Sequence, residues 1–550
     1  MPLMAAPARA TSACKRLKSF AMRETPMMRA AAALLVAIGV GLRTWNLTTA
    51  PMWLDEAYSA YAADHDFGFL WRVTPLYETH PPFYYSLLRL WVLAFGDSLT
   101  ALRLFGWIAG LLTLPTMVLA ANGAARWMGW SEMHRRALAL AAVGLSALSL
   151  VMVRMTHEIR PYPLMILLYA TALTLILQLA RRSEARAPIA GPILAAYLIA
   201  LECLLWLHNL GPLFGLALSI AFAIAVLRPE LPRRDWLWLI AGHALVALLY
   251  LPSLAILRGQ LATWTVKTWL QFRLDLALLD RIQTLYGVAG WVGLASLLLA
   301  ILAIRALMNT DRGIRLAATL LVLALLPVIL AILVSLTITP VFITRILTPT
   351  AVPALLLLAI GATAPGRHRL PGVAAAMLVG ASMLVGNVQA DLGRPMQDWY
   401  RSVHWLASRF RPGDQVFAYP NEGKLPLHYA LRDKGLDFPI RAIPTDVPAL
   451  EVRHGRHPAG TRGASALPQT ELRVIGNEPA TRAVPTIWLL RLGAETYDPG
   501  DVFLRELHHG RYIVRSWRDG PIDIVGLRVR PEAHATPILK PPRAPVRNRR

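Results

Sequence analysis

The hydrophobic residues of this chain gather in long runs between Ala30 and about residue 390, with short polar or basic stretches between them. The runs are about 16 to 24 residues long, close to the roughly 20 residues that a helix needs to cross a bilayer. We therefore predict about 11 transmembrane helices. They lie at 30–45, 104–123, 137–155, 163–180, 189–207, 211–227, 236–255, 287–306, 315–338, 347–364 and 371–389.

The composition supports a polytopic α-helical membrane protein. Over 550 residues, 55% are hydrophobic and only 16% are charged, which is too apolar for an ordinary soluble protein. The net charge is +23, from 56 basic and 33 acidic residues. The bases lie in short clusters between apolar runs, where they indicate topology, so we predict no nucleic-acid partner. The two cysteines, Cys14 and Cys203, exclude a disulfide framework and a cysteine metal site.

The distribution of basic residues predicts which end of each helix faces the cytoplasm. Residues 1–29 carry six bases against one acid, and the positive-inside rule makes them a cytoplasmic segment. A cleaved signal peptide is the alternative, which the long charged region and the many later runs disfavour. From this start, a basic cluster falls on every inner turn. The clusters are Arg126/Arg135/Arg136, Arg181/Arg182/Arg186, Arg228/Arg233/Arg234, Arg305/Arg312/Arg315 and Arg367/Arg369.

The first outer loop, 46–103, is large because we do not count Pro82–Gly96 as a span. That stretch has only about 15 residues and contains Arg89. A crossing there would place the next basic cluster outside, against the charge rule, so we predict a helix on the outer surface. One outer loop, 256–286, departs from the rule with four bases against two acids. Either these bases bind an anion or the length of the loop weakens the rule.

The chain becomes mixed and polar after the transmembrane module at 30–390. Apolar and polar residues alternate around Val416–Tyr419, a Pro-Gly-Asp turn lies at 412–414, and Thr486–Leu490 resembles a buried strand. We predict a small outward-facing α/β domain over 391–530. Residues 531–550 are basic and rich in proline, which is typical of a disordered tail.

The first outer loop carries most of its charge as acid, including the adjacent pair Asp55-Glu56. Between Asn46 and Pro82 there are five acids against one base, Arg72. A carboxylate near a membrane surface can take a proton from an incoming hydroxyl or amine. This pair is therefore the best candidate for catalytic chemistry in the chain.

Several other polar residues lie at the predicted outer ends of spans, and each has a plainer structural explanation. Glu158 and Arg160 could form a local ion pair, His208 could belong to a tight turn, and Arg103 and Arg345 could snorkel to the interface. Together, bases around a carboxylate pair at one face suit an anionic lipid substrate, because arginines stabilise charge on a departing phosphate. The apolar groove between spans would hold an isoprenoid.

These residues also resemble a known family over about residues 28–430. The pair Asp-Glu, then His-Pro-Pro-Phe-Tyr-Tyr from His80, Arg-Leu-Phe-Gly from Arg103, His-Glu-Ile-Arg-Pro-Tyr up to Tyr162, and Phe-Ile-Thr-Arg-Ile-Leu-Thr-Pro around Arg345 carry the likeness. They are similar to motifs of the protein-mannosyltransferase-like branch of the GT-C membrane glycosyltransferases. The resemblance implies a GT-C fold in a bacterial inner membrane, a polyprenyl-phosphate sugar donor, a cell-envelope acceptor and a periplasmic reaction that inverts the anomeric carbon.

The resemblance also implies roles for particular residues. Asp55 matches the catalytic aspartate and would be the general base, with Glu56 supporting it. Arg103 matches a functional arginine of protein mannosyltransferases, and His80 stands where a lysine or histidine precedes the paired prolines. Glu158, Arg160 and Tyr162 match a Glu-Ala-Arg-x-Tyr pattern, with Ile159 in place of alanine. Arg345 matches the arginine of Arg-Tyr-Leu-x-Pro, with Ile346 in place of tyrosine.

The resemblance leaves cofactors and substrates open. Some relatives bind a divalent metal (Mg²⁺, Mn²⁺ or Zn²⁺), and others need none. Where many members carry an acid directly before the His-Pro-Pro step, this chain has Thr79, with Glu78 one place earlier. The acceptor could be a lipid, a polysaccharide or protein serine and threonine. The alternative from another class is a flippase that moves a lipid-linked sugar without bond chemistry, although we find neither inverted repeats nor charges near a bilayer centre.

Overall fold

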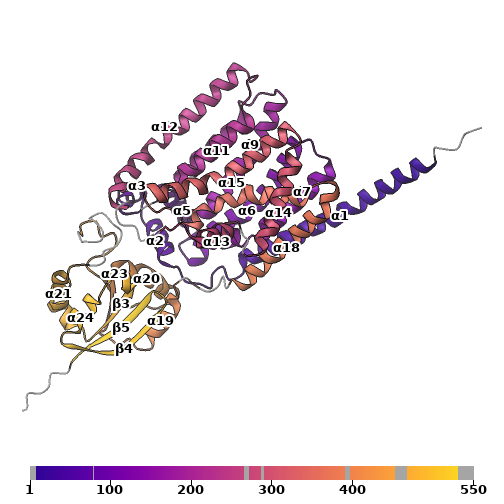
Figure 1. Ribbon diagram of the computed structural model, residues 1–550. Helices are drawn as coiled ribbons and strands as arrows, with labels where there is room; N and C mark the ends of the chain where they lie inside the picture. The colour runs from indigo at the N-terminus through magenta and orange to yellow at the C-terminus, as the bar shows by residue number, and fades with distance from the viewer. Residues whose placement is uncertain are drawn as a thin grey trace, which may run out of the picture. The chain divides into compact units, whose positions relative to one another are not determined.

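The chain divides into two compact units, residues 1–398 and 399–550, which are described separately. The computed structural model describes residues 8–78, 80–264, 272–286, 290–390, 395, 397–452 and 467–530. The first unit is helical, and the second contains a five-stranded sheet (Figure 1). The division lies slightly beyond the predicted boundary at residue 391. The predicted tail, 531–550, falls outside the described residues.

Each predicted span coincides with a helix, a broken helix or a bent pair of helices in the first unit. Among the described residues, seven helices are long and apolar enough to cross a membrane, and the bent pair α7–α8 would make eight. The shorter apolar helices α10, α11 and α14 have 16 residues each, or about 24 Å at 1.5 Å per residue. The polytopic class is therefore confirmed, and the count of eleven crossings stays a prediction. The helices are α1 (Ala8–Thr44), α6 (Leu99–Trp127), α7 (Glu132–Leu148), α8 (Leu150–Thr156), α9 (Tyr162–Glu184), α10 (Pro192–Leu207), α11 (Gly211–Val226), α12 (Arg233–Trp264), α14 (Val292–Leu307), α15 (Asp311–Thr337), α16 (Thr344–Leu347), α17 (Ala351–Ala362) and α18 (Arg369–Gln389).

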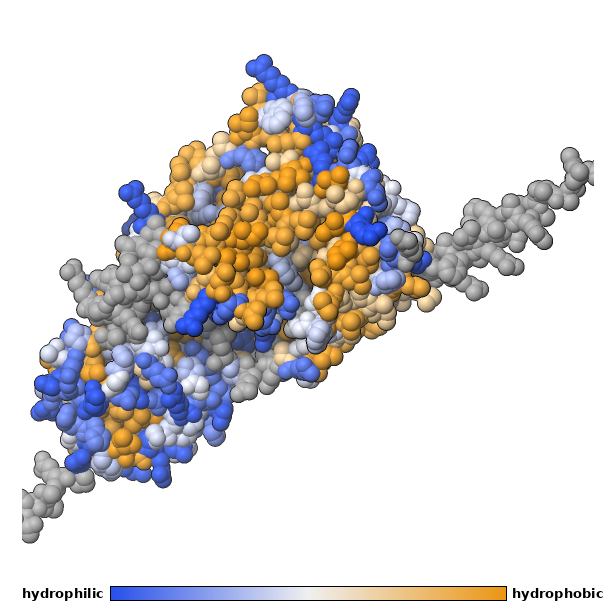
Figure 2. Space-filling view, viewed as in Figure 1, coloured by the Kyte–Doolittle hydropathy of each residue, from blue (hydrophilic) through white to orange (hydrophobic). Residues whose placement is uncertain are grey.

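The outer surface of the helical unit is broadly apolar, as Figure 2 shows by its orange area. Leucines such as Leu249 and Leu333 are half exposed there, as expected for side chains that meet lipid rather than water. Inside the bundle, glycines allow close helix packing. A Cβ atom on Gly39 would lie 2.7 Å from the Cβ of Ala147, and one on Gly110 would lie 2.4 Å from Oγ1 of Thr156. These contacts bring α1 against α7 and α6 against α8.

The span predicted at 137–155 corresponds to two helices, α7 and α8, which meet at Ser149. α7 and α8 meet there at 57°, which leaves the last carbonyls of α7 without helical partners. Side chains of two other helices bind those carbonyls. Arg43 donates to Ser146 O and Ala147 O, both at 3.0 Å, and Asn387 Nδ2 donates to Leu148 O at 2.7 Å. These bonds satisfy the last three carbonyls of α7 and hold the direction in which α8 leaves the break.

The first outer loop folds into four short helices, α2 (Leu54–Ala63), α3 (Phe67–Arg72), α4 (Thr74–Tyr77) and α5 (Pro82–Phe95). α5 has 14 residues, about 21 Å, which is too short to span the hydrocarbon core. α12 extends beyond the predicted residue 255, and its outer end packs on this loop. Gln260 donates to Pro75 O at 3.0 Å and accepts from Asn209 Nδ2 at 2.9 Å. A further helix, α13 (Leu276–Leu285), follows.

The second unit is the small α/β domain that the sequence predicts. Its strands are β1 (Gln415–Tyr419), β2 (Ile440–Ala442), β3 (Thr486–Leu492), β4 (Arg511–Asp519) and β5 (Ile522–Val529), in the order β2-β1-β3-β5-β4. β1 pairs in parallel with β2 and β3, whereas β5 runs antiparallel to both β3 and β4. Helices α21 (Gln469–Asn477) and α24 (Val502–His508) cover one face, and α19 (Trp399–Ala407) and α20 (Lys424–Asp433) cover the other (Figure 1).

Candidate active site

The adjacent acids Asp55 and Glu56 lie in the first turn of α2, where the helix dipole favours negative charge. Their carboxylates have different partners. Oδ2 of Asp55 lies 3.0 Å from Nη2 of Arg345, whereas Oε2 of Glu56 lies 3.2 Å from Nη2 of Arg103. The pair that looks like one feature in the sequence is therefore two separate ion pairs.

Glu56 holds three segments together. Its Oε2 also accepts from the backbone N–H of Trp53, and its Oε1 accepts from the backbone N–H of Ile159 at 3.0 Å. Its partner Arg103 donates to Leu47 O at 2.7 Å as well. Glu56 is only 1% exposed and Arg103 only 4%. Both side chains are thus committed to bonds that join α2, α6 and the loop before α9.

Arg160 belongs to a second buried network. Its Nη1 donates to Asp55 O at 3.1 Å and to Oγ of Ser59, and its Nη2 donates to Nε2 of His80 at 3.1 Å. His80 Nδ1 then lies 3.0 Å from Oε1 of Glu78. Burial, and secondly the charge of Arg160, lowers the pKa of His80, so the neutral ring donates from Nδ1 and accepts at Nε2. Arg160 therefore holds the backbone of α2 in place.

The rings of His208 and Tyr162 pack beside this network. The rings of His208 and His80 meet edge to face with centroids 4.5 Å apart, and Tyr162 lies 6.3 Å from His208. Nδ1 of His208 accepts from the backbone N–H of Leu210 at 3.0 Å. Burial, followed by the nearby His80 and Arg160, keeps the pKa of His208 well below its usual value. Both imidazoles are consequently neutral at pH 7.

These residues do not fit a metal centre. Glu78 and His80 hydrogen bond to each other, and the guanidinium of Arg160 lies on the other side of the His80 ring. A bound cation beside that guanidinium would be repelled. Across the described ranges, no three His, Cys, Asp or Glu side chains gather closely enough to hold an ion. We derive no metal-dependent step for this site.

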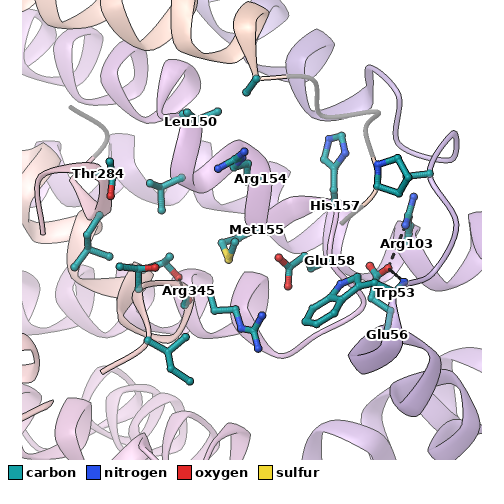
Figure 3. Close-up of a pocket in the computed structure, with 18 of the residues that line it drawn as sticks. Trp53, Glu56, Arg103, Leu150, Arg154, Met155, His157, Glu158, Thr284 and Arg345 are labelled. Atoms are coloured by element: carbon teal, nitrogen blue, oxygen red, sulfur yellow. Dashed lines mark hydrogen bonds and ion pairs between the residues drawn. The ribbon is translucent and has the colours of Figure 1, made fainter. Parts of the chain in front are cut away.

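A cavity of about 870 Å³ lies beside the ion pair of Asp55 and Arg345. Arg345 lines it, and its guanidinium stacks 4.9 Å above the ring of Trp53. Figure 3 shows Arg345, Glu158 and Arg154 around this space. Its walls come from the 50–56 loop, α6, α8, α13, the 343–348 segment and the end of α18. The lining residues include Pro51, Trp53, Arg103, Leu150, Val151, Arg154, Met155, Glu158, Leu285, Ile343, Arg345 and Ala390.

The sequence analysis did not single out Arg154. This arginine is exposed in the cavity wall and makes no hydrogen bond or ion pair in the described part of the chain. A signal was present, because Arg154 precedes Glu158 by four residues, the spacing that places two side chains on one helical face. Its position inside a predicted span concealed it. Trp53, which the sequence analysis also did not name, packs under Arg345.

Glu158 is another lining residue with an unpaired polar atom. Its Oε2 atom is buried and has no hydrogen-bond partner among the residues that the structure describes. Burial raises the pKa of Glu158 from 4.5 to about 7, against the opposing charge of Arg345 and with the support of Glu56. Glu158 is therefore protonated in a substantial fraction of molecules at neutral pH.

This shift predicts a pH effect on stability. An acid whose pKa is raised by folding stabilises the folded state below its ordinary pKa of 4.5, and that contribution is lost as pH rises through about 7. Glu158→Gln imitates the protonated acid. We expect the variant and the natural protein to melt alike near pH 4.5, and the variant to melt higher at about pH 8. Thermal melting of the detergent-solubilised protein measures this.

The matched control for this melting series is Glu132→Gln. Glu132 is an exposed acid whose pKa is lowered by its hydrogen bonds to Arg135 and Arg136. It is fully ionised across the range in which Glu158 titrates, so its substitution should give no pH-dependent difference between about pH 6 and pH 8. If the difference in melting temperature between Glu158→Gln and the natural protein also did not change with pH, the raised pKa of Glu158 would be contradicted.

Comparisons with known proteins relate the chain to solved membrane structures. No family model matches the chain, and no curated protein matches it. ArnT from Cupriavidus metallidurans in the apo state aligns with a TM-score of 0.54 and 14% identity, covering 90% of this chain and 97% of that one. The same protein bound to undecaprenyl phosphate aligns with a TM-score of 0.50, 13% identity and the same coverage. The arabinofuranosyltransferase AftD from Mycobacteria gives 0.49 and 14%, over 92% of this chain and 40% of its own.

At this level of identity the likeness shows the fold alone. That fold agrees with the one that the sequence motifs imply. It extends over nine tenths of the chain and nearly all of ArnT. The chain is therefore a polytopic α-helical membrane protein with the fold of ArnT.

Proposed function

We propose that this protein is an inverting membrane glycosyltransferase that moves a sugar from a polyprenyl-phosphate donor to a cell-envelope acceptor. One observation carries the proposal: the carboxylate of Asp55 is paired with Arg345, and Arg345 lines a cavity of about 870 Å³. A base and a cation thus lie side by side where an acceptor and a phosphate would meet. The fold supports this reading, because ArnT with the same fold has been solved with undecaprenyl phosphate bound.

In the proposed reaction, Asp55 takes the proton of an acceptor hydroxyl or amine. The freed oxygen or nitrogen attacks the anomeric carbon, and the bond from that carbon to the phosphate oxygen breaks. The bonding electrons leave with the phosphate, so the second product is polyprenyl phosphate. Attack and departure occur on opposite faces in one displacement, which inverts the anomeric carbon.

Arg345 is suited to the departing phosphate. Nη2 binds Asp55, while Nε has no hydrogen-bond partner in the described ranges and the side chain is 21% exposed. A guanidinium can bind two oxygens along one edge, so Arg345 can contact Asp55 and a phosphate together. The apolar lining, which includes Leu150, Met155 and Ile343, would contact the first isoprene units. Arg160 positions these groups from outside the cavity lining, whereas Arg103 and Glu56 border the cavity and are bonded to each other.

The test is the mass of the product that the full-length protein forms in proteoliposomes. The vesicles contain a defined polyprenyl-phosphate sugar, and lipid A, envelope polysaccharide or protein is supplied as acceptor. We expect an acceptor heavier by one sugar residue, together with free polyprenyl phosphate. Movement of intact lipid-linked sugar across the bilayer with no heavier acceptor would instead identify a flippase.

The proposal places the reaction on the periplasmic face of the bacterial inner membrane. An alkaline phosphatase fusion at position 60, inside α2, should therefore be active, because that reporter folds only outside the cytoplasm. A fusion after Trp130, in the turn between α6 and α7, should be inactive. The opposite pair of results would place Asp55 in the cytoplasm and overturn the proposed orientation.

A further inference from the structure

Arg154 and Glu158 form a pair of unsatisfied groups on one wall of the cavity. Arg154 has no bonded partner in the part of the chain that the structure describes, and Oε2 of Glu158 is buried without one. Arg154 lies near the end of α8 and Glu158 just beyond it, and Arg345 lines the same space (Figure 3). A buried oxygen without a partner is costly, and the exposed guanidinium beside it is available to an anion.

The other charges around Glu158 are already committed. Asp55 uses Arg345, Glu56 uses Arg103, and Arg160 is bonded to the backbone of α2. Of the cations around Glu158, Arg154 alone is uncommitted, and no ion pair joins it to Glu158 within the described residues. The charged and titratable groups that face it are Asp55 and Glu56 from α2, Tyr84 from α5, Arg103 from α6, Arg154 and His157 from its own segment, Arg160 and Tyr162 before and in α9, and Arg345 from α16.

We propose that this cavity binds the phosphate of a lipid phosphodiester between Arg154 and Arg345, and that Glu158 takes up a proton when it binds. The identity of the anion as a phosphate rests on the proposed function. An ionised Glu158 would repel the phosphate, whereas the neutral acid can donate a hydrogen bond from Oε2 to a phosphate oxygen. The proton comes from solvent, and no covalent bond changes.

This coupling also favours product release. The sugar donor is a phosphodiester with one negative charge, and the product polyprenyl phosphate is a monoester that can carry a second charge. An ionised Glu158 repels the dianion more strongly than the monoanion, because the repulsion is proportional to the charge. Loss of the proton from Glu158 would therefore assist departure of the spent lipid before a new donor binds.

The test is isothermal titration of the solubilised full-length protein with methyl farnesyl phosphate near pH 7. This probe is a diester with no group that titrates near neutrality, so any proton exchange comes from the protein. Titrations in buffers of different ionisation enthalpy give the number of protons taken up. With a pKa of about 7 for Glu158, we expect uptake of about half a proton per bound lipid.

Three variants and one control show which residues cause the proton uptake and the lipid binding. Glu158→Gln should still bind but take up no proton, and Glu158→Asp should retain the uptake. Arg154→Gln should bind about 10-fold to 100-fold more weakly, because a charge-assisted hydrogen bond is lost. Arg72→Gln, an exposed arginine of α3 outside the cavity, should bind like the natural protein. Each variant is first checked for a single symmetric peak in size-exclusion chromatography.

The outcomes separate this inference from the proposed function. Proton uptake that persists in Glu158→Gln, or unchanged affinity in a folded Arg154→Gln, would overturn it. Equal affinity for dimethyl phosphate, which lacks the lipid tail, would show a site for free phosphate and overturn the lipid part. Binding with the predicted uptake but no sugar transfer would leave the inference standing and remove the glycosyltransferase proposal.

Discussion

Asp55→Asn should reduce sugar transfer by about 10²-fold to 10⁴-fold, the usual contribution of a general base. Asparagine has the same shape, and its side-chain oxygen can still accept from Nη2 of Arg345, but it cannot take a proton at neutral pH. The cavity and the network of Arg160 should be preserved, because Arg160 contacts the backbone oxygen of Asp55 and not its carboxylate. The measurement is the initial rate of labelled sugar transfer in proteoliposomes.

Two comparisons make this result specific. Asp64→Asn, an exposed acid at the end of the same helix, should leave the rate unchanged. Titration with methyl farnesyl phosphate should show that Asp55→Asn binds the lipid nearly as well as the natural protein. A variant that folds, binds and transfers sugar at the full rate would exclude Asp55 as the base.

Glu56→Ala should give the largest loss of stability, about 3 to 5 kcal/mol in the free energy of unfolding. The substitution leaves the guanidinium of Arg103 buried without its counter-charge, and the backbone N–H groups of Trp53 and Ile159 lose their acceptor. Thermal or denaturant unfolding of the purified protein measures the effect. Glu132→Ala removes an exposed acid with two arginine partners and should change stability little.

A double substitution separates the buried charge from simple loss of packing. Removal of both partners in Glu56→Ala/Arg103→Met should recover part of the lost stability, because no unpaired charge then remains. If the double variant lost more stability than the two single variants lose in sum, the unpaired charge would not explain the effect of Glu56→Ala. The two neighbouring acids of α2 are therefore expected to differ in effect: Asp55→Asn lowers the rate of sugar transfer, and Glu56→Ala lowers the stability of the fold.

The helices could be predicted from the sequence because apolar runs of spanning length have few other solutions in a membrane. The break at Ser149 could not, because nothing local requires it. It depends on Arg43 and Asn387, which lie about 100 and 240 residues away and bind the freed carbonyls. The extension of α12 beyond residue 255 is similar, since Gln260 is held by partners in the first outer loop and at Asn209.

The site could be predicted as a set of residues but not as a set of pairings. Asp55, His80, Arg160, His208 and Arg345 come from distant segments, and the charge rule placed all of them at one face. Which arginine binds which acid depends on side-chain directions, which the sequence does not give. Arg160 is bonded to protein away from the cavity, whereas Arg103 and Arg345 both line it. Arg154 was missed because an apolar run concealed it.

The broken helix has a consequence for specificity. α8 carries Arg154 and borders Glu158, and its direction is held by bonds from Arg43 on α1 and Asn387 on α18. Neither of these residues lines the cavity. Substitutions at positions 43 and 387 would therefore re-aim the recognition groups while leaving them chemically unchanged. Substitutions outside the cavity could in this way change which lipid headgroup a protein of this fold binds. A comparison of the lining residues alone would not detect such a change.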